Sequence, residues 1–156
     1  MPVTAKEKAL RLLTVRARSR DGLRRRLMQA GYEEAEVDQA LDDLERVGLL
    51  DDRKFAEDMV SHRLRIGGYG SRAALGALRK EGIPREIAEQ AVASTRWDDE
   101  EARAEEVAWT RAARLSSLPH EVAYRRLLGF LQRRGFDPDV ARTVTNRVLE
   151  SDAPRV

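Results

Sequence analysis

Arginine is the residue type in this chain whose number and spacing could do chemistry. Of the 29 basic residues, 25 are Arg, and the planar guanidinium pairs through parallel hydrogen bonds with a phosphate or a carboxylate. Three clusters occur, each on or just before a predicted helix. One such helix could be merely solvated, but three in a repeated register favour contact with an anionic partner, either nucleic acid or an acidic protein groove. The predicted contact residues are Arg16, Arg18, Arg20, Arg24, Arg25, Arg26, Arg63, Arg65, Arg72, Arg79, Lys80, Arg125, Arg126 and Arg133.

The glycine-rich stretch IGGYGSRAAL, residues 66–75, raises the alternative of nucleotide binding. A P-loop needs Lys followed by Ser or Thr after its glycines and a strand before them, and a dinucleotide-binding loop needs G-x-G-x-x-G after a strand. Neither condition holds. We interpret the stretch as a turn between two helices, with Ser71 as N-cap in the position that Ser19 occupies earlier. A single phosphate contact at that helix N-terminus, beside Arg72, stays open.

Residues for catalysis or metal binding are sparse. The chain has two His, His62 and His120, and no Cys, so no metal-ligand spacing emerges. Ser19 and Ser71 lack a neighbouring base. The pair Asp51 and Asp52 is interpreted as a helix cap, because side chains adjacent in sequence at a helix start point apart. We therefore expect no catalytic residue, no metal and no cofactor, and a protein that is not an enzyme.

Composition restricts the class of protein. Charged residues make up 36% of the chain and hydrophobic ones 42%, which suits a helical protein with wide solvated faces. The absence of Cys fits a reducing compartment. No apolar run approaches the roughly 20 residues of a membrane span. We expect a cytoplasmic, monomeric protein without membrane contact.

A repeat of about 50 residues organises the chain. Gly31, Gly82 and Gly135 each follow a leucine at the fourth position before them (Leu27, Leu78 and Leu131), and each precedes a bulky apolar residue. This form predicts a helix, a glycine stop and a second helix, because glycine adopts the left-handed conformation past a last turn at little cost. Within the basic helix of the first repeat, the helical period places Leu23, Leu27 and Ala30 inward.

The predicted fold class is all-α. We expect three tandem three-helix repeats, helix-turn-helix-like, over residues 4–50, 51–96 and 97–152, stacked in an elongated curved array. Acidic third helices are expected to pair with the basic faces of neighbouring repeats, to face away from the partner, or to be solvated. The predicted helices lie near residues 4–15, 20–30, 34–47, 52–65, 71–81, 84–94, 98–115, 119–134 and 138–150.

Three runs resemble one known family. LLTVRARSRDGLRRRL, GLLDDRKFAEDMVSHRL and GSRAALGALRKEGIPREI are similar to the RecX family of regulators of the RecA recombinase. The family pattern has three parts that this chain matches, and the resemblance covers residues 9–92. The first part is Arg16, Arg18 and Ser19. The second is Gly48, Leu50, Asp51, Asp52, Phe55 and Ala56, followed by Arg63, and the third is the turn of Gly70, Ser71 and Arg72. Glu81 departs from the pattern, since the family usually has Lys or Arg there.

The resemblance implies a function as well as a fold. It implies a modular regulator that lies along the filament of RecA on single-stranded DNA, inhibits RecA by blocking extension or promoting disassembly, and so modulates recombination and DNA repair. It also implies that the regulator binds single-stranded and double-stranded DNA. The alternative class is a DNA-binding helix-turn-helix regulator of transcription, which would usually dimerise to contact two half-sites; no dimerising coiled coil is evident.

Overall fold

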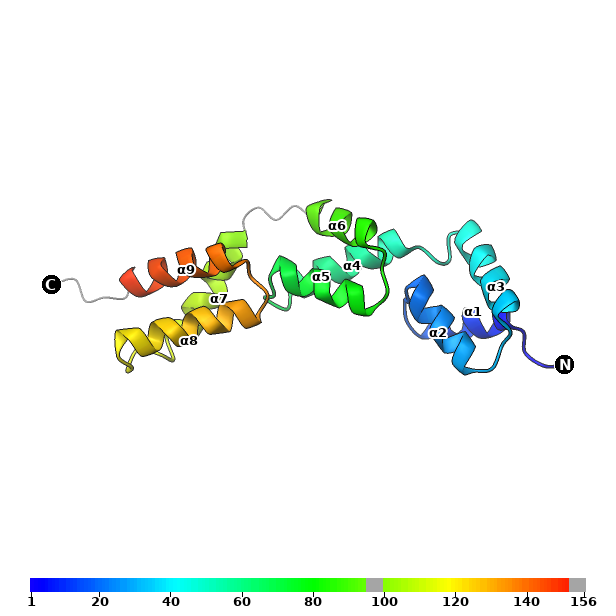
Figure 1. Cartoon of the computed structure of the whole chain (residues 1–156), viewed down its shortest axis with the longest axis horizontal. Helices are drawn as coiled ribbons and strands as arrows, with labels where there is room; N and C mark the ends of the chain where they lie inside the picture. The colour runs from blue at the N-terminus through cyan, green and yellow to red at the C-terminus, as the bar shows by residue number, and fades with distance from the viewer. Residues whose placement is uncertain (95–99, 152–156) are drawn as a thin grey trace. The chain divides into compact units, whose positions relative to one another are not determined.

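The computed structural model describes residues 1–94 and 100–151, apart from the side chain of Arg65. These residues form nine helices and no strand, which confirms the all-α prediction (Figure 1). The two starting positions of the predicted helix 98–115 lie outside the described residues. The helices are α1 (Ala5–Val15), α2 (Arg20–Gln29), α3 (Glu34–Arg46), α4 (Asp52–Arg65), α5 (Ser71–Lys80), α6 (Arg85–Ser94), α7 (Glu100–Ala112), α8 (His120–Arg133) and α9 (Pro138–Ser151).

The chain divides into two compact units. Unit 1 consists of Met1–Met59 and Ala77–Ala93, and unit 2 consists of Val60–Gly76 and Ser94–Val156. Helices α1, α2 and α3 pack on one another in unit 1, and α7, α8 and α9 pack on one another in unit 2. The predicted middle repeat is therefore divided, since α4 and α5 each contribute residues to both units.

The core of unit 1 is a leucine cluster. Leu23 and Leu27 of α2 are fully buried against Val37, Leu41 and Leu44 of α3. The prediction for the two leucines is confirmed. The prediction that Ala30 faces inward is wrong: Ala30 is the exposed C-cap of α2, although its backbone is still right-handed helical (φ −77°, ψ −3°). The helical period gives a direction, but burial also needs a neighbouring element to cover the side chain, and Ala30 does not belong to the leucine cluster.

The core of unit 2 joins small residues to large ones. Ala104 and Ala108 of α7 are fully buried, and so are Leu127 and Leu131 of α8. Small side chains on α7 allow close helix packing, and Phe136, in the turn before α9, fills the space at the end of the cluster with 1% of its surface exposed.

Local capping follows the predictions at two helix starts and differs at a third. Ser19 Oγ accepts from Gly22 N at the start of α2, and Asp51 Oδ1 accepts from Lys54 N before α4, so these two predictions are confirmed. Asp137 Oδ1 accepts from Asp139 N in the same way before α9. Ser71 is not an N-cap, because it is already the first residue of α5.

Gly70 holds the cap position of α5 instead. Its carbonyl accepts from Ala74 N at 3.2 Å, as that of Ser19 accepts from Leu23 N at 2.9 Å. The structural counterpart of Ser19 is therefore Gly70. Ser19 and Gly70 are separated by the same interval as Gly31 and Gly82, so the same alignment of the first two repeats matches both the helix starts and the helix ends.

The turn before α5 docks on the turn after α8 inside unit 2. Gly70 N donates to Arg134 O at 2.8 Å, and Arg72 N donates to Gly135 O at 3.1 Å. A side chain at Gly70 would collide with the backbone of Gly135 and Phe136. Close backbone approach, rather than phosphate binding, is thus what this glycine permits.

Carboxylates occupy the starts of two basic helices. Asp52 Oδ1 accepts from Arg20 N at 2.8 Å in unit 1, and Glu100 Oε1 accepts from Ser71 N at 3.2 Å and from Ser71 Oγ at 3.0 Å in unit 2. An anion is favoured at a helix N-terminus, and here the chain supplies its own. At the start of α5, Ser71 N and Arg72 N thus have acceptors within the chain, and the phosphate contact beside Arg72 stays a prediction.

Candidate functional site

Five of the predicted contact residues converge on one pocket of unit 1. The pocket has a volume of about 530 Å³, and the cationic side chains that line it come from the turn before α2, from α2 itself and from the end of α5. They are Arg16, Arg18, Arg25, Arg26 and Lys80. The carboxylate of Glu81 also lines the pocket, so like charges dominate it.

Arg18 is the most enclosed of these cations. Burial lowers the pKa of the Arg18 guanidinium, the positive charges of Arg16 and Arg26 lower it further, and Glu81 only partly opposes them. Its Nε is buried and has no hydrogen-bond partner among the described residues. A buried donor without an acceptor is unfavourable by about 1–3 kcal/mol, so this arrangement favours an anion that supplies an acceptor.

The other cations of the pocket differ in how firmly they are held. Arg25 Nε lies 3.0 Å from Asp21 Oδ2, and its Nη2 donates to Lys80 O at 3.3 Å. Arg16 and Arg26 are exposed and form no ion pair among the described residues. Their charge is therefore available to a ligand, whereas that of Arg25 is partly compensated.

Arg20 and Arg24 form ion pairs with α3 and do not line the pocket. Arg20 contacts Asp42 at 2.9 Å and Glu45 at 2.8 Å, and Arg24 pairs with Glu34 at 2.7 Å and with Asp38. The hydrogen bonds and charges of the two acidic partners raise the pKa of Arg20 against the opposing effect of burial. The acidic third helix therefore pairs within its own triplet. For α3, the prediction of pairing with a neighbouring repeat is wrong. In α6, Glu86 is exposed in the first turn and Glu89 pairs with Arg85 of the same helix, as expected for a solvated helix face.

The remaining predicted residues are distributed over both units. In unit 2, Arg63 lies over the Tyr69 ring at 5.8 Å, and Arg72 lies 3.6 Å from Asp137. Arg79 of unit 1 is exposed. The side chain of Arg65 lies outside the described part of the structure.

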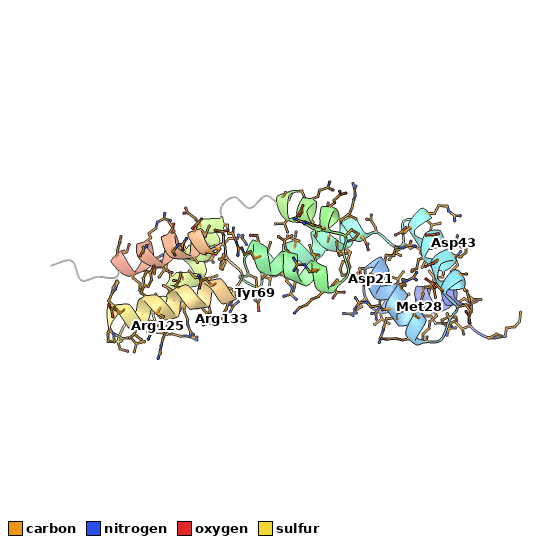
Figure 2. All side chains as sticks on the ribbon, in the orientation of Figure 1. Asp21, Met28, Asp43, Tyr69, Arg125 and Arg133 are labelled. Atoms are coloured by element: carbon orange, nitrogen blue, oxygen red, sulfur yellow. The ribbon has the colours of Figure 1, made fainter. Side chains whose placement is uncertain are left out.

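The three predicted arginines of α8 share one side of that helix. Arg125, Arg126 and Arg133 are exposed, and Figure 2 shows Arg125 and Arg133 on the side of α8 that points away from α9. No ion pair involves these three residues among the described residues of unit 2, where Arg72, Arg142 and Arg147 form the pairs.

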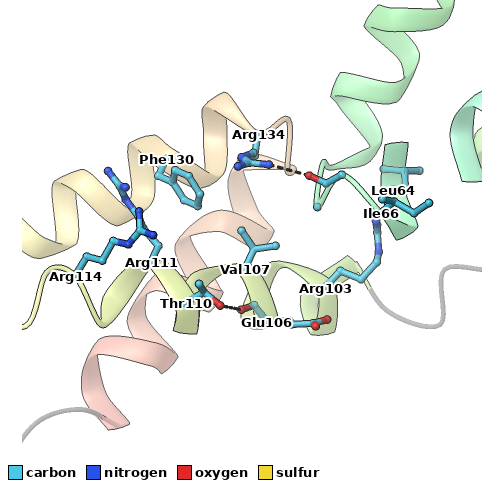
Figure 3. A pocket seen from close by; sticks show the side chains of 12 residues that line it. Leu64, Ile66, Arg103, Glu106, Val107, Thr110, Arg111, Arg114, Phe130 and Arg134 are labelled. Atoms are coloured by element: carbon cyan, nitrogen blue, oxygen red, sulfur yellow. Dashed lines mark hydrogen bonds between the residues drawn. The ribbon is translucent and has the colours of Figure 1, made fainter. Parts of the chain in front are cut away.

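A second arginine pocket, in unit 2, was missed by the sequence reasoning. It has a volume of about 630 Å³ and is lined by Arg103, Arg111, Arg114 and Arg134 (Figure 3). Arg103, Val107, Arg111 and Arg114 recur at intervals of three or four and so share one face of α7 and the turn that follows it. That spacing was the signal available in the sequence.

The described residues offer neither a metal site nor a membrane span. Within the described residues, no group of three or more His, Asp or Glu could hold a metal ion. His120 stacks on Tyr124 with ring centroids 6.5 Å apart. None of the helices in the described ranges is both long and apolar enough to cross a bilayer.

Comparison with known proteins identifies relatives of similar length. The chain is 37% identical over 145 residues to "Regulatory protein RecX" of Amycolatopsis mediterranei, covering 93% of this chain and 83% of the relative. It is 39% identical over 155 residues to the protein of the same name from Mycolicibacterium smegmatis, covering 97% of this chain and 82% of the relative.

A solved structure and sequence models of the family agree with these relatives. The crystal structure of RecX from Lactobacillus salivarius superposes with a TM-score of 0.84 at 22% identity, over 92% of this chain and 94% of that one. The first, second and third three-helix domains of RecX match residues 5–44, 51–92 and 98–145. The all-α fold and these matches together show that the chain belongs to the RecX family of regulatory proteins.

Proposed function

We propose that this chain regulates the RecA recombinase, mainly as an inhibitor. It binds along the filament that RecA forms on single-stranded DNA and blocks extension of the filament or promotes its disassembly, and so modulates recombination and DNA repair. The pocket of unit 1 makes the central contact. The observation that carries this proposal is the convergence of Arg16, Arg18, Arg26 and Lys80 on one cavity with a single opposing carboxylate, that of Glu81.

The physical reasoning is electrostatic. A DNA strand and the acidic side chains of a protein filament both offer anionic oxygens, which guanidinium groups bind through charge-assisted hydrogen bonds. Arg18 adds a guanidinium whose Nε has no hydrogen-bond partner among the described residues. The exposed arginines outside the pocket extend the proposed contact surface: Arg63, Arg72, Arg79, Arg125, Arg126 and Arg133.

The proposal also covers where and how the chain acts. It acts by binding, without catalysis, as a cytoplasmic monomer. The three repeats over residues 4–50, 51–96 and 97–152 are the proposed structural modules. Direct affinity for single-stranded and double-stranded DNA is part of the proposal.

The test is the DNA-dependent ATPase of RecA. Substoichiometric protein is expected to slow ATP hydrolysis, and a double variant with Arg16→Gln and Arg26→Gln is expected to lose most of this effect. Arg46→Gln is the matched control, because Arg46 is 70% exposed and pairs with Asp43 three positions away on α3. An unchanged ATPase rate at equimolar protein would contradict the proposal. Preference for one duplex sequence in the presence of competitor DNA would instead support a transcription regulator.

A further inference from the structure

The second arginine pocket is built differently from the first. It lies wholly within unit 2, between the end of α4, one face of α7 and the end of α8 (Figure 3). Four arginines and one carboxylate, that of Glu106, line it. Its apolar walls include Leu64, Ile66 and Val107. The cavity therefore combines an excess of positive charge with aliphatic surface.

Stacking and backbone carbonyls hold the guanidinium groups in place. Arg134 Nη1 donates to Gly67 O at 2.8 Å, and the Arg134 guanidinium lies 4.9 Å from the centroid of Tyr69 and 5.2 Å from that of Phe130. The Arg111 guanidinium lies 5.1 Å from the Phe130 centroid. Interactions of this kind orient a cation without neutralising it.

In the part of unit 2 that the structure describes, no carboxylate holds Arg111 or Arg114 in place. Neither residue forms an ion pair among the described residues, where the pairs of unit 2 involve Arg72, Arg142 and Arg147. Arg111 Nε is buried and has no hydrogen-bond acceptor within the described ranges. The guanidinium of Arg111 therefore keeps its positive charge without a carboxylate partner among the described residues.

The side chains that line this pocket favour an acidic peptide over a nucleic-acid strand. A nucleic-acid strand binds well where its bases find open aromatic faces, but guanidinium groups lie over both Phe130 and Tyr69. An aliphatic side chain, by contrast, finds matching surface on Val107 and on Ile66, which is 75% exposed. The pocket thus suits a peptide that carries carboxylates next to aliphatic side chains.

We propose that this pocket binds an acidic peptide segment of a partner protein, with carboxylates on Arg111 and Arg114 and an aliphatic side chain against Val107. The proposal goes beyond the proposed function, because it concerns a surface outside the pocket of unit 1 and its test contains no RecA. Failure of one proposal therefore leaves the other standing.

Fluorescence anisotropy with the full chain tests the proposal. The probes are short labelled peptides of alternating Asp and Leu, of Asn and Leu, and of Asp and Ser, with a single-stranded oligothymidylate as the nucleic-acid probe. The Asp–Leu peptide is expected to bind most tightly, because only it offers both carboxylates and aliphatic side chains.

Two variants locate the site. Arg111→Gln is expected to weaken binding of the Asp–Leu peptide about tenfold or more, the range of one lost charge-assisted hydrogen bond. Thr110→Glu, at an exposed position of the pocket, is expected to weaken it similarly by adding a competing carboxylate, without removing a packed side chain. Arg142→Gln is the matched control: it removes the same charge from α9 of unit 2, where Arg142 pairs with Asp139.

Three results would overturn the proposal. If the Asn–Leu peptide bound as tightly as the Asp–Leu peptide, the carboxylates would not contribute to binding. Unchanged binding by the folded Arg111→Gln and Thr110→Glu proteins, with circular dichroism spectra like that of the parent, would place the peptide elsewhere. Tighter binding of oligothymidylate, lost in the same two variants, would assign the pocket to nucleic acid.

Discussion

The hydroxyl of Ser19 donates a hydrogen bond of 2.5 Å to the backbone carbonyl of Glu81, 62 positions later in the chain. The same oxygen accepts from Gly22 N at 3.0 Å, and Ser19 is fully buried. One small side chain therefore both caps α2 and fastens the turn before α2 to the turn after α5. A side chain at Gly82 would collide there with Asp21, so the two turns are in close contact.

Replacement of Ser19 should destabilise unit 1. Ser19→Ala removes an N-cap, worth about 1 kcal/mol, and leaves the carbonyl of Glu81 without its donor, which adds about 1–2 kcal/mol. We expect a loss of about 2–3 kcal/mol in the free energy of unfolding, measured by urea denaturation. Ser117→Ala is the control, because Ser117 is exposed; it should change stability by less than about 0.5 kcal/mol. Equal effects of the two changes would contradict the fastening role.

Substitutions at Gly135 and Gly31 distinguish the cost of a left-handed backbone conformation from the cost of a steric collision between docked turns. Both have positive φ, 83° and 92°, but a side chain at Gly135 would collide with Ala73, whereas nothing lies within 4 Å of one at Gly31. Gly31→Ala should therefore cost only the left-handed conformation, about 1–2 kcal/mol. Gly135→Ala should cost about 1–3 kcal/mol more, because it also overpacks the docked turns. Thermal or urea unfolding measures both, and similar losses would show that the turns dock loosely.

Arg24 and Arg26 should contribute differently to DNA affinity. The logarithm of the binding constant for a single strand falls with the logarithm of salt concentration, by about 0.7 for each phosphate that is neutralised. Arg26→Gln should reduce this slope by about that amount. Arg24→Gln should reduce it much less, because Glu34 and Asp38 already pair with Arg24. Titrations at several salt concentrations measure the slopes, and an equal reduction by both changes would mean that Arg24 leaves its partners to bind DNA.

Asp43 should make stability depend on pH in the acidic range. A hydrogen bond from Gln39 lowers the pKa of Asp43, and the charges of Lys6 and Arg46 lower it further against the opposing effect of burial. Because the pKa in the folded state lies below that of the unfolded chain, about 3.9, the stabilisation is fully present above the unfolded value. It disappears as the pH falls through the folded value.

The measurement is urea unfolding of the parent and of Asp43→Asn, from about pH 7 to about pH 3. The stability difference between them should be constant above about pH 5 and shrink below about pH 4. Gln39→Ala, which keeps the carboxylate but removes the Gln39 donor, should give an intermediate dependence. Parallel curves for parent and Asp43→Asn over the whole range would refute the assignment.

Much of the local structure could be predicted from the residues. The glycines at 31, 82 and 135 mark helix ends, and Ser19, Asp51 and Asp137 mark helix starts, because each of these signals acts within one turn of the chain. The buried positions of Leu23 and Leu27 follow from the helical period for the same reason. The prediction for Ala30 was wrong because the helical period gives a direction but does not say whether another element covers the side chain at the end of α2. The prediction for Ser71 was wrong because Gly70 makes the same turn without a side-chain cap.

The sequence by itself determined the all-α class, the repeat and the abundance of arginine, since these depend on neighbours within a few positions. Only the tertiary structure decided which arginines are available. It pairs Arg20 and Arg24 with the acids of α3, gathers Arg16, Arg18 and Arg26 at one pocket, and places Arg111 beside Phe130 at another. The physical reason is that charge compensation depends on distances between side chains from different helices, and those distances exist only after the helices have packed.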